Sequence, residues 1–134
     1  RAWEVALVAL PVLAAVGGRL VPEWHRVDAA SLLASAAFAL INGVGEELLW
    51  RGAFLRAFPA SRLLGVALPA ALFTLSHVAP TLLLGGAPAV LGAVLFIGVV
   101  NGVIGRRLGG LRLVIAAHVL VDLAGLLGLT MLGR

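Results

Sequence analysis

The chain has 134 residues, of which 62% are hydrophobic and only 12% are charged, and its formal net charge is +4. Soluble domains carry roughly 45–50% apolar and about 25% charged residues, so this composition argues against a water-soluble domain and predicts an all-α bundle of transmembrane helices. All ten basic residues are arginines that lie between apolar stretches, which argues against a nucleic-acid-binding protein. The absence of cysteine excludes disulfides, thiolate metal ligands and a cysteine nucleophile.

Five hydrophobic stretches predict five membrane helices joined by short connections. In chain order these helices cover residues 4–20, 29–57, 63–84, 88–105 and 112–132. The first stretch has no small-residue cleavage site before Pro22, so we interpret it as a short membrane helix rather than a signal peptide. Asp28 is suited to cap the second helix, and residues 59–62 predict a turn between antiparallel helices. Gly109 and Gly110 separate the fourth helix from the fifth.

The arginines are distributed unevenly between the two ends of these helices. Short loops on the cytoplasmic side of a membrane are enriched in Lys and Arg. Counting alternate loops assigns seven arginines to one side and three to the other: Arg1, Arg51, Arg56, Arg62, Arg106, Arg107 and Arg112 against Arg19, Arg26 and Arg134. This count predicts a multi-pass protein of the cell membrane with its N-terminus in the cytoplasm.

Two adjacent acids lie inside the second predicted helix. A carboxylate at membrane depth costs about 2.5–3.5 kcal/mol on insertion scales, so such residues are functional candidates. Glu47 and Arg51 are four residues apart and share a helical face, which predicts a buried ion pair. Glu46 is rotated by about 100° from Glu47, so we expect it to point elsewhere, into a cavity between neighbouring helices.

Two histidines lie in later predicted helices, each with a partner four residues away on the same face. Phe73 precedes His77, and Asp122 follows His118. A single histidine on an apolar helix is usually a satisfied core residue. Because these histidines and the paired acids are almost the only ionisable groups in apolar helices, one shared polar site explains them together.

Distances along the helices test whether these groups lie at one depth. Glu46 precedes Pro59 by thirteen residues and His77 follows Arg62 by fifteen, so both lie roughly 20 Å from their common turn. His118 lies only six residues after the start of its helix, or roughly 9 Å, which does not match. The mismatch eases if residues 108–113 enter the protein as irregular backbone.

A carboxylate and an imidazole in such a site have a definite chemistry. Together they can hold a water molecule and remove its proton, and the hydroxide can attack a peptide carbonyl. A second imidazole can donate to the developing oxyanion. Alternatively, Glu46, His77 and His118 meet the requirements of a three-ligand zinc site with an open position for water. The residue types leave both mechanisms open.

The three motifs in this order resemble one known family. Glu-Glu-x-x-x-Arg at 46–51, Phe-x-x-x-His at 73–77 and His-x-x-x-Asp at 118–122 are similar to the CPBP family, also called the ABI family. That family includes CAAX prenyl endopeptidases and proteins linked to bacteriocin processing or self-immunity. The resemblance runs over residues 42–126 and implies one transmembrane protease-like domain over residues 1–134. Since the chain begins at Arg1 rather than Met, a fragment of a longer protein is one interpretation.

The resemblance also implies roles for individual residues. Glu46 with His77 activates the water, and His118 with Asp122 lines the oxyanion side. The supporting residues that it implies are Glu47, Arg51 and Phe73. Many members carry Asn where this chain has Asp122, and an ionised Asp cannot donate a hydrogen bond, so Asp122 is either protonated or orients His118. Members have been described as metalloproteases and as glutamate proteases, so the resemblance leaves open whether zinc is a cofactor.

The expected substrate is a peptide or protein in or near the membrane, where lipids are the other partners. The arginine-only basic set, with abundant Ala, Gly, Leu and Val, resembles a GC-rich prokaryotic genome, in which prenylated CAAX tails are not expected. The sequence lacks the motifs of serine, site-2 and aspartyl intramembrane proteases. Two non-proteolytic alternatives remain on the same scaffold: a binding or immunity protein, and a small proton-coupled transporter.

Overall fold

The structure is a computed structural model that describes residues 2–83 and 88–130. Within these ranges the chain forms helices and no strand. The longer α-helices are α1 (Ala2–Ala15), α3 (Ala29–Glu47), α5 (Leu68–Ser76), α7 (Pro88–Leu108) and α8 (Arg112–Thr130). Shorter α-helical segments are α2 (Val21–Glu23), α4 (Phe54–Ala57) and α6 (Val78–Leu83). Three π-helical segments, Val16–Leu20, Leu48–Ala53 and Leu63–Ala67, and one 3-10 turn, Trp24–Arg26, adjoin them.

Four of the helical stretches are long and apolar enough to cross a membrane. They are Ala2–Leu20, Ala29–Ala57, Leu63–Leu83 and Pro88–Leu108, and α8 follows as the fifth helix. The predicted all-helical architecture is therefore confirmed, with the fourth helix three residues longer than expected. The helix ends predicted at 84 and 132 lie outside the described residues.

The connections between helices follow from local chemistry. Asp28 caps α3 as predicted, because its Oδ1 accepts a hydrogen bond from the backbone N–H of Ser31 at 2.7 Å. Ser61 caps the next helix, since its Oγ accepts from the N–H of Leu64 at 3.0 Å. Gly109 has a φ of +64°, a left-handed conformation that suits glycine after the end of α7. The break before α8 is confined to residues 109–111, so the irregular backbone expected over 108–113 is not formed.

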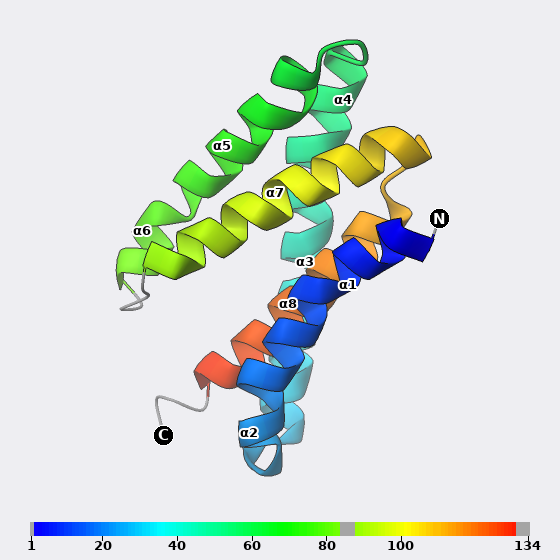
Figure 1. The fold of residues 1–134 in the computed structure, drawn as a ribbon. Helices are drawn as coiled ribbons and strands as arrows, with labels where there is room; N and C mark the ends of the chain where they lie inside the picture. The colour runs from blue at the N-terminus through cyan, green and yellow to red at the C-terminus, as the bar shows by residue number, and fades with distance from the viewer. Residues whose placement is uncertain (1, 84–87, 131–134) are drawn as a thin grey trace. The chain divides into compact units, whose positions relative to one another are not determined.

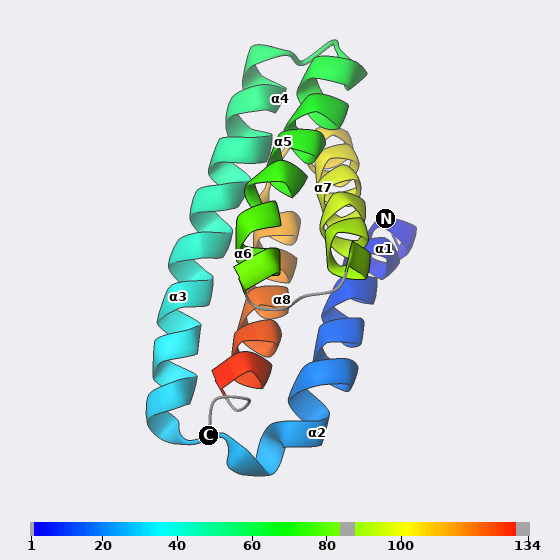
Figure 2. The ribbon, with the colours of Figure 1, turned by 90° about the vertical axis from the view of Figure 1, so that its left-hand side faces the viewer.

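The chain divides into two compact units, and the first combines Arg1–Glu47 with Arg112–Arg134. In this unit α8 lies between α1 and α3 (Figure 2). The backbones of α3 and α8 approach closely at Gly43, where a Cβ atom would lie 2.9 Å from Cγ2 and 3.1 Å from the backbone N of Val119. Small residues allow helices to pack at short range inside a membrane. Gly43 therefore sets the separation of the two helices that carry most of the site.

The second unit comprises Leu48–Leu111. In it α5 and α7 run side by side (Figure 1). Gly98 and Gly102 form a Gly-x-x-x-Gly pair on one face of α7, where Gly98 meets α5 and Gly102 meets the preceding Leu63–Ala67 segment. A Cβ atom at Gly98 would lie 3.2 Å from Cα of Ala70, and one at Gly102 would lie 2.9 Å from Cγ1 of Val66.

Many large apolar side chains face outward. Leu33, Ile41 and Leu83 are 72%, 76% and 86% exposed, for example. A water-soluble protein rarely presents such extensive apolar surface, whereas lipid chains solvate it well. The exposed surface therefore agrees with helices that lie in a bilayer.

Candidate active site

The first unit brings together polar side chains from α3 and α8. Glu46 and Glu47 occupy the last turn of α3, and His118 lies in the second turn of α8. His118 adjoins Val119, the residue against which Gly43 packs. The close approach of the two helices therefore carries the imidazole to the acids.

The deepest contact of this cluster joins His118 to Glu47. Nδ1 of His118 lies 2.8 Å from Oε1 of Glu47, and the two residues are only 4% and 0% exposed. A carboxylate oxygen accepts, so the Nδ1–H group donates this hydrogen bond. The bond fixes the ring orientation and turns Nε2 toward the more open side of the cluster.

Two further carboxylates face the other nitrogen of the same ring. Nε2 of His118 lies 3.4 Å from Oε2 of Glu46 and 3.6 Å from Oδ1 of Asp122, whose side chains are 23% and 18% exposed. The prediction that Glu46 points away from the surroundings of Glu47 is therefore corrected, because one acid faces each ring nitrogen. The sequence also predicted that His118 lies at a different membrane depth from Glu46. That prediction is corrected, because the ring of His118 approaches both Glu46 and Glu47.

Asn42 completes the cluster and was not predicted as a site residue. Its Nδ2 donates a hydrogen bond of 2.9 Å to Oδ2 of Asp122. Asn42 lies four residues before Glu46 on one face of α3, so spacing was the signal that could have identified it. The contact leaves Oδ1 of Asp122 on the side of His118.

The second unit contains a cluster of aromatic and basic side chains. Arg51, in the π-helical segment Leu48–Ala53, is 1% exposed, and its Cζ lies 4.4 Å from the ring centroid of Phe73. The ring of His77 meets Phe73 edge to face at 4.5 Å. Phe73 is 2% exposed, so the guanidinium and the imidazole both pack against one buried aromatic ring.

His77 lies between α5, which ends at Ser76, and α6, which begins at Val78, rather than inside one continuous helix. Its Nδ1 lies 2.8 Å from the carbonyl oxygen of Phe73, which also accepts from Oγ of Ser76 at 2.7 Å. A carbonyl oxygen only accepts, so Nδ1 of His77 carries a proton. In the neutral ring, Nε2 of His77 is then unprotonated and able to accept a proton.

The predicted residues thus fall into two groups. The first unit holds Glu46, Glu47, His118 and Asp122, and the second holds Arg51, Phe73 and His77. The predicted pairings of Glu46 with His77 and of Glu47 with Arg51 each join residues of different units, and both stay predictions.

Among the residues that the structure describes, no group of three or more His, Asp or Glu side chains is arranged to hold a metal ion. The zinc site at Glu46, His77 and His118 also stays a prediction.

Comparison with known proteins identifies one similar family. The family model described as type II CAAX prenyl endopeptidase, Rce1-like, matches residues 28–124. The matched range covers the acids of α3, His77 and the His118–Asp122 pair. No curated protein and no solved structure matches the chain.

Proposed function

Because the chain belongs to the Rce1-like family of type II CAAX prenyl endopeptidases, we propose that it is an intramembrane endopeptidase whose water-activating acid is Glu46. The family and the four helices long enough to span a bilayer make it a membrane protein. One observation carries the assignment of the site: the ring of His118 has Glu47 at one nitrogen and Glu46 at the other.

The proposed reaction begins with a water molecule beside Glu46. Glu46 removes a proton from this water while its oxygen attacks the carbonyl carbon of the peptide bond. The carbonyl becomes a tetrahedral oxyanion, and the proton then passes to the departing amide nitrogen as the C–N bond breaks. The products are a carboxylate and an amine, so one water is consumed for each bond hydrolysed.

His118 is proposed to stabilise the oxyanion through Nε2. Because Nδ1–H donates to Glu47, Nε2 donates only when both ring nitrogens are protonated. The carboxylates of Glu46, Glu47 and Asp122 supply negative charge next to such an imidazolium. Asp122 orients the ring and is itself held by Asn42, which favours the orienting role over hydrogen-bond donation.

His77 is proposed to assist Glu46 in water activation. Its Nδ1 proton is committed to the carbonyl of Phe73, which leaves Nε2 as the acceptor. The ring of Phe73, against which Arg51 also packs, contacts the imidazole and holds it in place. This role requires that Nε2 of His77 and Glu46 contact the same water.

The test compares purified wild-type protein with Glu46→Gln in liposomes. The probes are a farnesylated CAAX peptide and the same peptide without the lipid, and new N-termini are detected by mass spectrometry. We expect Glu46→Gln to lower hydrolysis by about 10²–10⁴-fold, the usual contribution of a general base. Asp28→Asn is the matched control, because it makes the same acid-to-amide change at a helix cap outside the site.

Two further measurements separate the mechanisms. Activity that survives 1,10-phenanthroline, in protein without stoichiometric zinc, supports water activation by side chains. Activity that is lost in the chelator and restored by zinc supports the metal site instead. Unchanged hydrolysis in Glu46→Gln contradicts the proposal, as does a wild-type protein that cleaves neither probe nor any protein of its own membrane.

A further inference from the structure

A groove on the second unit combines arginines with apolar side chains. The cavity has a volume of about 550 Å³ and lies between the start of the Leu63–Ala67 segment and the end of α7. Three of its lining residues are the arginines Arg62, Arg106 and Arg107. The remaining lining is small and apolar, from Val66, Ala67, Val99 and Val103.

The charged and apolar parts of the groove are separated along the helix axis. Arg107 lies eight residues after Val99 on α7, so the arginines are roughly 12 Å nearer the helix end than the deepest valine. Val99 and Val103 are four residues apart and share a face of α7. The groove therefore has a cationic end beside the loops and an apolar floor that extends into the bundle.

Arg106 is one of the three arginines of the cationic end. Its Nη2 donates a 3.2 Å hydrogen bond to the carbonyl oxygen of Ala60. Its Nη1 is buried, yet it has no hydrogen-bond partner among the described residues. The guanidinium is thus held in position by the loop while one of its nitrogens remains free for an external acceptor.

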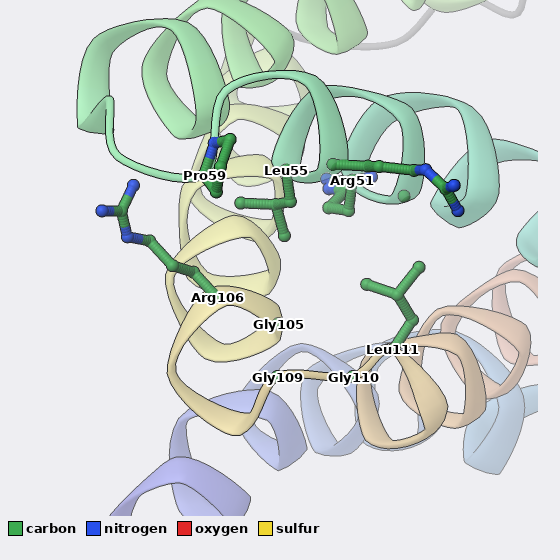
Figure 3. A pocket seen from close by; sticks show the side chains of 10 residues that line it. Arg51, Leu55, Pro59, Gly105, Arg106, Gly109, Gly110 and Leu111 are labelled. Atoms are coloured by element: carbon green, nitrogen blue, oxygen red, sulfur yellow. The ribbon is translucent and has the colours of Figure 1, made fainter.

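A neighbouring cavity shares Arg106. Its volume is about 330 Å³, and Arg51, Arg56 and Arg106 are its charged lining residues. Figure 3 shows Leu55 and Pro59 on one side of this cavity and the end of α7, with Gly105, on the other. Neither cavity has an Asp or Glu among the described residues that line it.

The geometry points to a binding site for one anionic phospholipid, whose phosphate lies at Arg106 between Arg62 and Arg107 and whose acyl chain covers Val99 and Val103. Arginine binds phosphate through paired hydrogen bonds, and basic pockets between membrane helices bind anionic head groups. A free phosphate ion would satisfy only the cationic end, whereas a phospholipid also covers the apolar floor. The site is independent of the proposed peptidase chemistry.

The test is native mass spectrometry of the full chain in detergent, titrated with phosphatidylglycerol or phosphatidylcholine of identical acyl chains. We expect one phosphatidylglycerol to bind roughly five- to tenfold more tightly than phosphatidylcholine, a preference that Arg106→Gln removes. Val103→Phe fills the apolar floor and should weaken both lipids. Because Val103 is 38% exposed, this change should not prevent folding.

Arg19→Gln is the matched control, since it removes an exposed arginine of the first unit. Equal binding of the two lipids by the wild type overturns the proposal, as does an equal loss in Arg19→Gln and Arg106→Gln. Displacement of the bound lipid by millimolar inorganic phosphate overturns it in favour of a free anion site. Retention of the lipid in phosphate, with loss in Arg106→Gln, supports it.

Discussion

The buried ring of His118 donates from Nδ1 to Oε1 of Glu47 across 2.8 Å, and neither residue is more than 4% exposed. Removing one partner of a buried charged pair leaves the other without compensation, typically at a cost of about 3–5 kcal/mol. We therefore expect Glu47→Ala to lower the free energy of unfolding by about 3 kcal/mol. Unfolding in mixed micelles of increasing SDS content, followed by circular dichroism, measures this loss.

Glu47→Gln is the conservative counterpart of that substitution. Its side-chain carbonyl still accepts from Nδ1–H, so the loss should be about 1–2 kcal/mol. Equal losses in Glu47→Ala and Glu47→Gln would show that the hydrogen bond to His118 contributes little to stability.

Gly43→Ala should destabilise the first unit and reduce activity. The added Cβ would lie 2.9 Å from Cγ2 and 3.1 Å from the backbone N of Val119, so α3 and α8 have to separate. Overpacking of this kind costs about 1–3 kcal/mol. Gly45→Ala is the control, because nothing lies within 4 Å of its added Cβ. A helix-interior Gly→Ala change without a clash is neutral or stabilising by up to about 1 kcal/mol, so a loss of equal size in both variants contradicts the close approach.

The hydrogen bond between Asn42 and Asp122 can be measured by a double-mutant cycle. Nδ2 of Asn42 donates to Oδ2 of Asp122 at 2.9 Å, and hydrogen bonds to charged groups contribute about 1.5–3 kcal/mol. The stabilities of Asn42→Ala, Asp122→Ala and the double variant should give a coupling energy of at least about 1 kcal/mol. Additive losses would mean that the two side chains do not interact.

Phe73→Leu should lower stability by about 1–3 kcal/mol. The substitution removes the ring that lies 4.4 Å below Cζ of Arg51 and meets the edge of His77 at 4.5 Å. Phe96→Leu is the control, since Phe96 lies on α7 and is 46% exposed. A larger loss in Phe96→Leu would contradict the central packing role of Phe73.

The orientation in the membrane can be tested with single cysteines, because the natural chain has none. Ala60 lies on the arginine-rich side, predicted to be cytoplasmic, and Trp24 lies in the preceding loop on the opposite side. A membrane-impermeant maleimide applied to intact cells should label Trp24→Cys and not Ala60→Cys. The reverse labelling pattern would place the N-terminus outside.

The helices were predictable because their signals are local. The length of each apolar run indicates a span, Asp28 offers a capping oxygen, and Gly109 tolerates the left-handed backbone that ends α7. The interruption at His77 was not predicted. Apart from His77 and a few small polar side chains, residues 63–83 are apolar, so mean hydropathy gives no sign that α5 ends at Ser76.

The candidate site was predictable in its residue types but not in its contacts. A charged side chain in an apolar helix is costly, and this cost identified Glu46 and Glu47. The helical rotation of about 100° suggested that the side chains of Glu46 and Glu47 diverge. Both are nevertheless long enough to reach the ring of His118, Glu47 at Nδ1 and Glu46 at Nε2. The depth estimate for His118 counted residues along one straight helix and carried no information on where α8 crosses α3. Asn42 is uncharged, so the cost of membrane insertion did not mark it.

The contact between Glu47 and His118 joins residues that are 71 positions apart, because the whole second unit is inserted between them in the chain. At a synthesis rate of about 5–20 residues per second, the imidazole leaves the ribosome roughly 4–14 seconds after the acids. During that interval the nascent helix with Glu46 and Glu47 meets the membrane while His118 is still inside the ribosome. Correct insertion of this protein therefore requires that the two acids are kept from lipid until α8 arrives with His118.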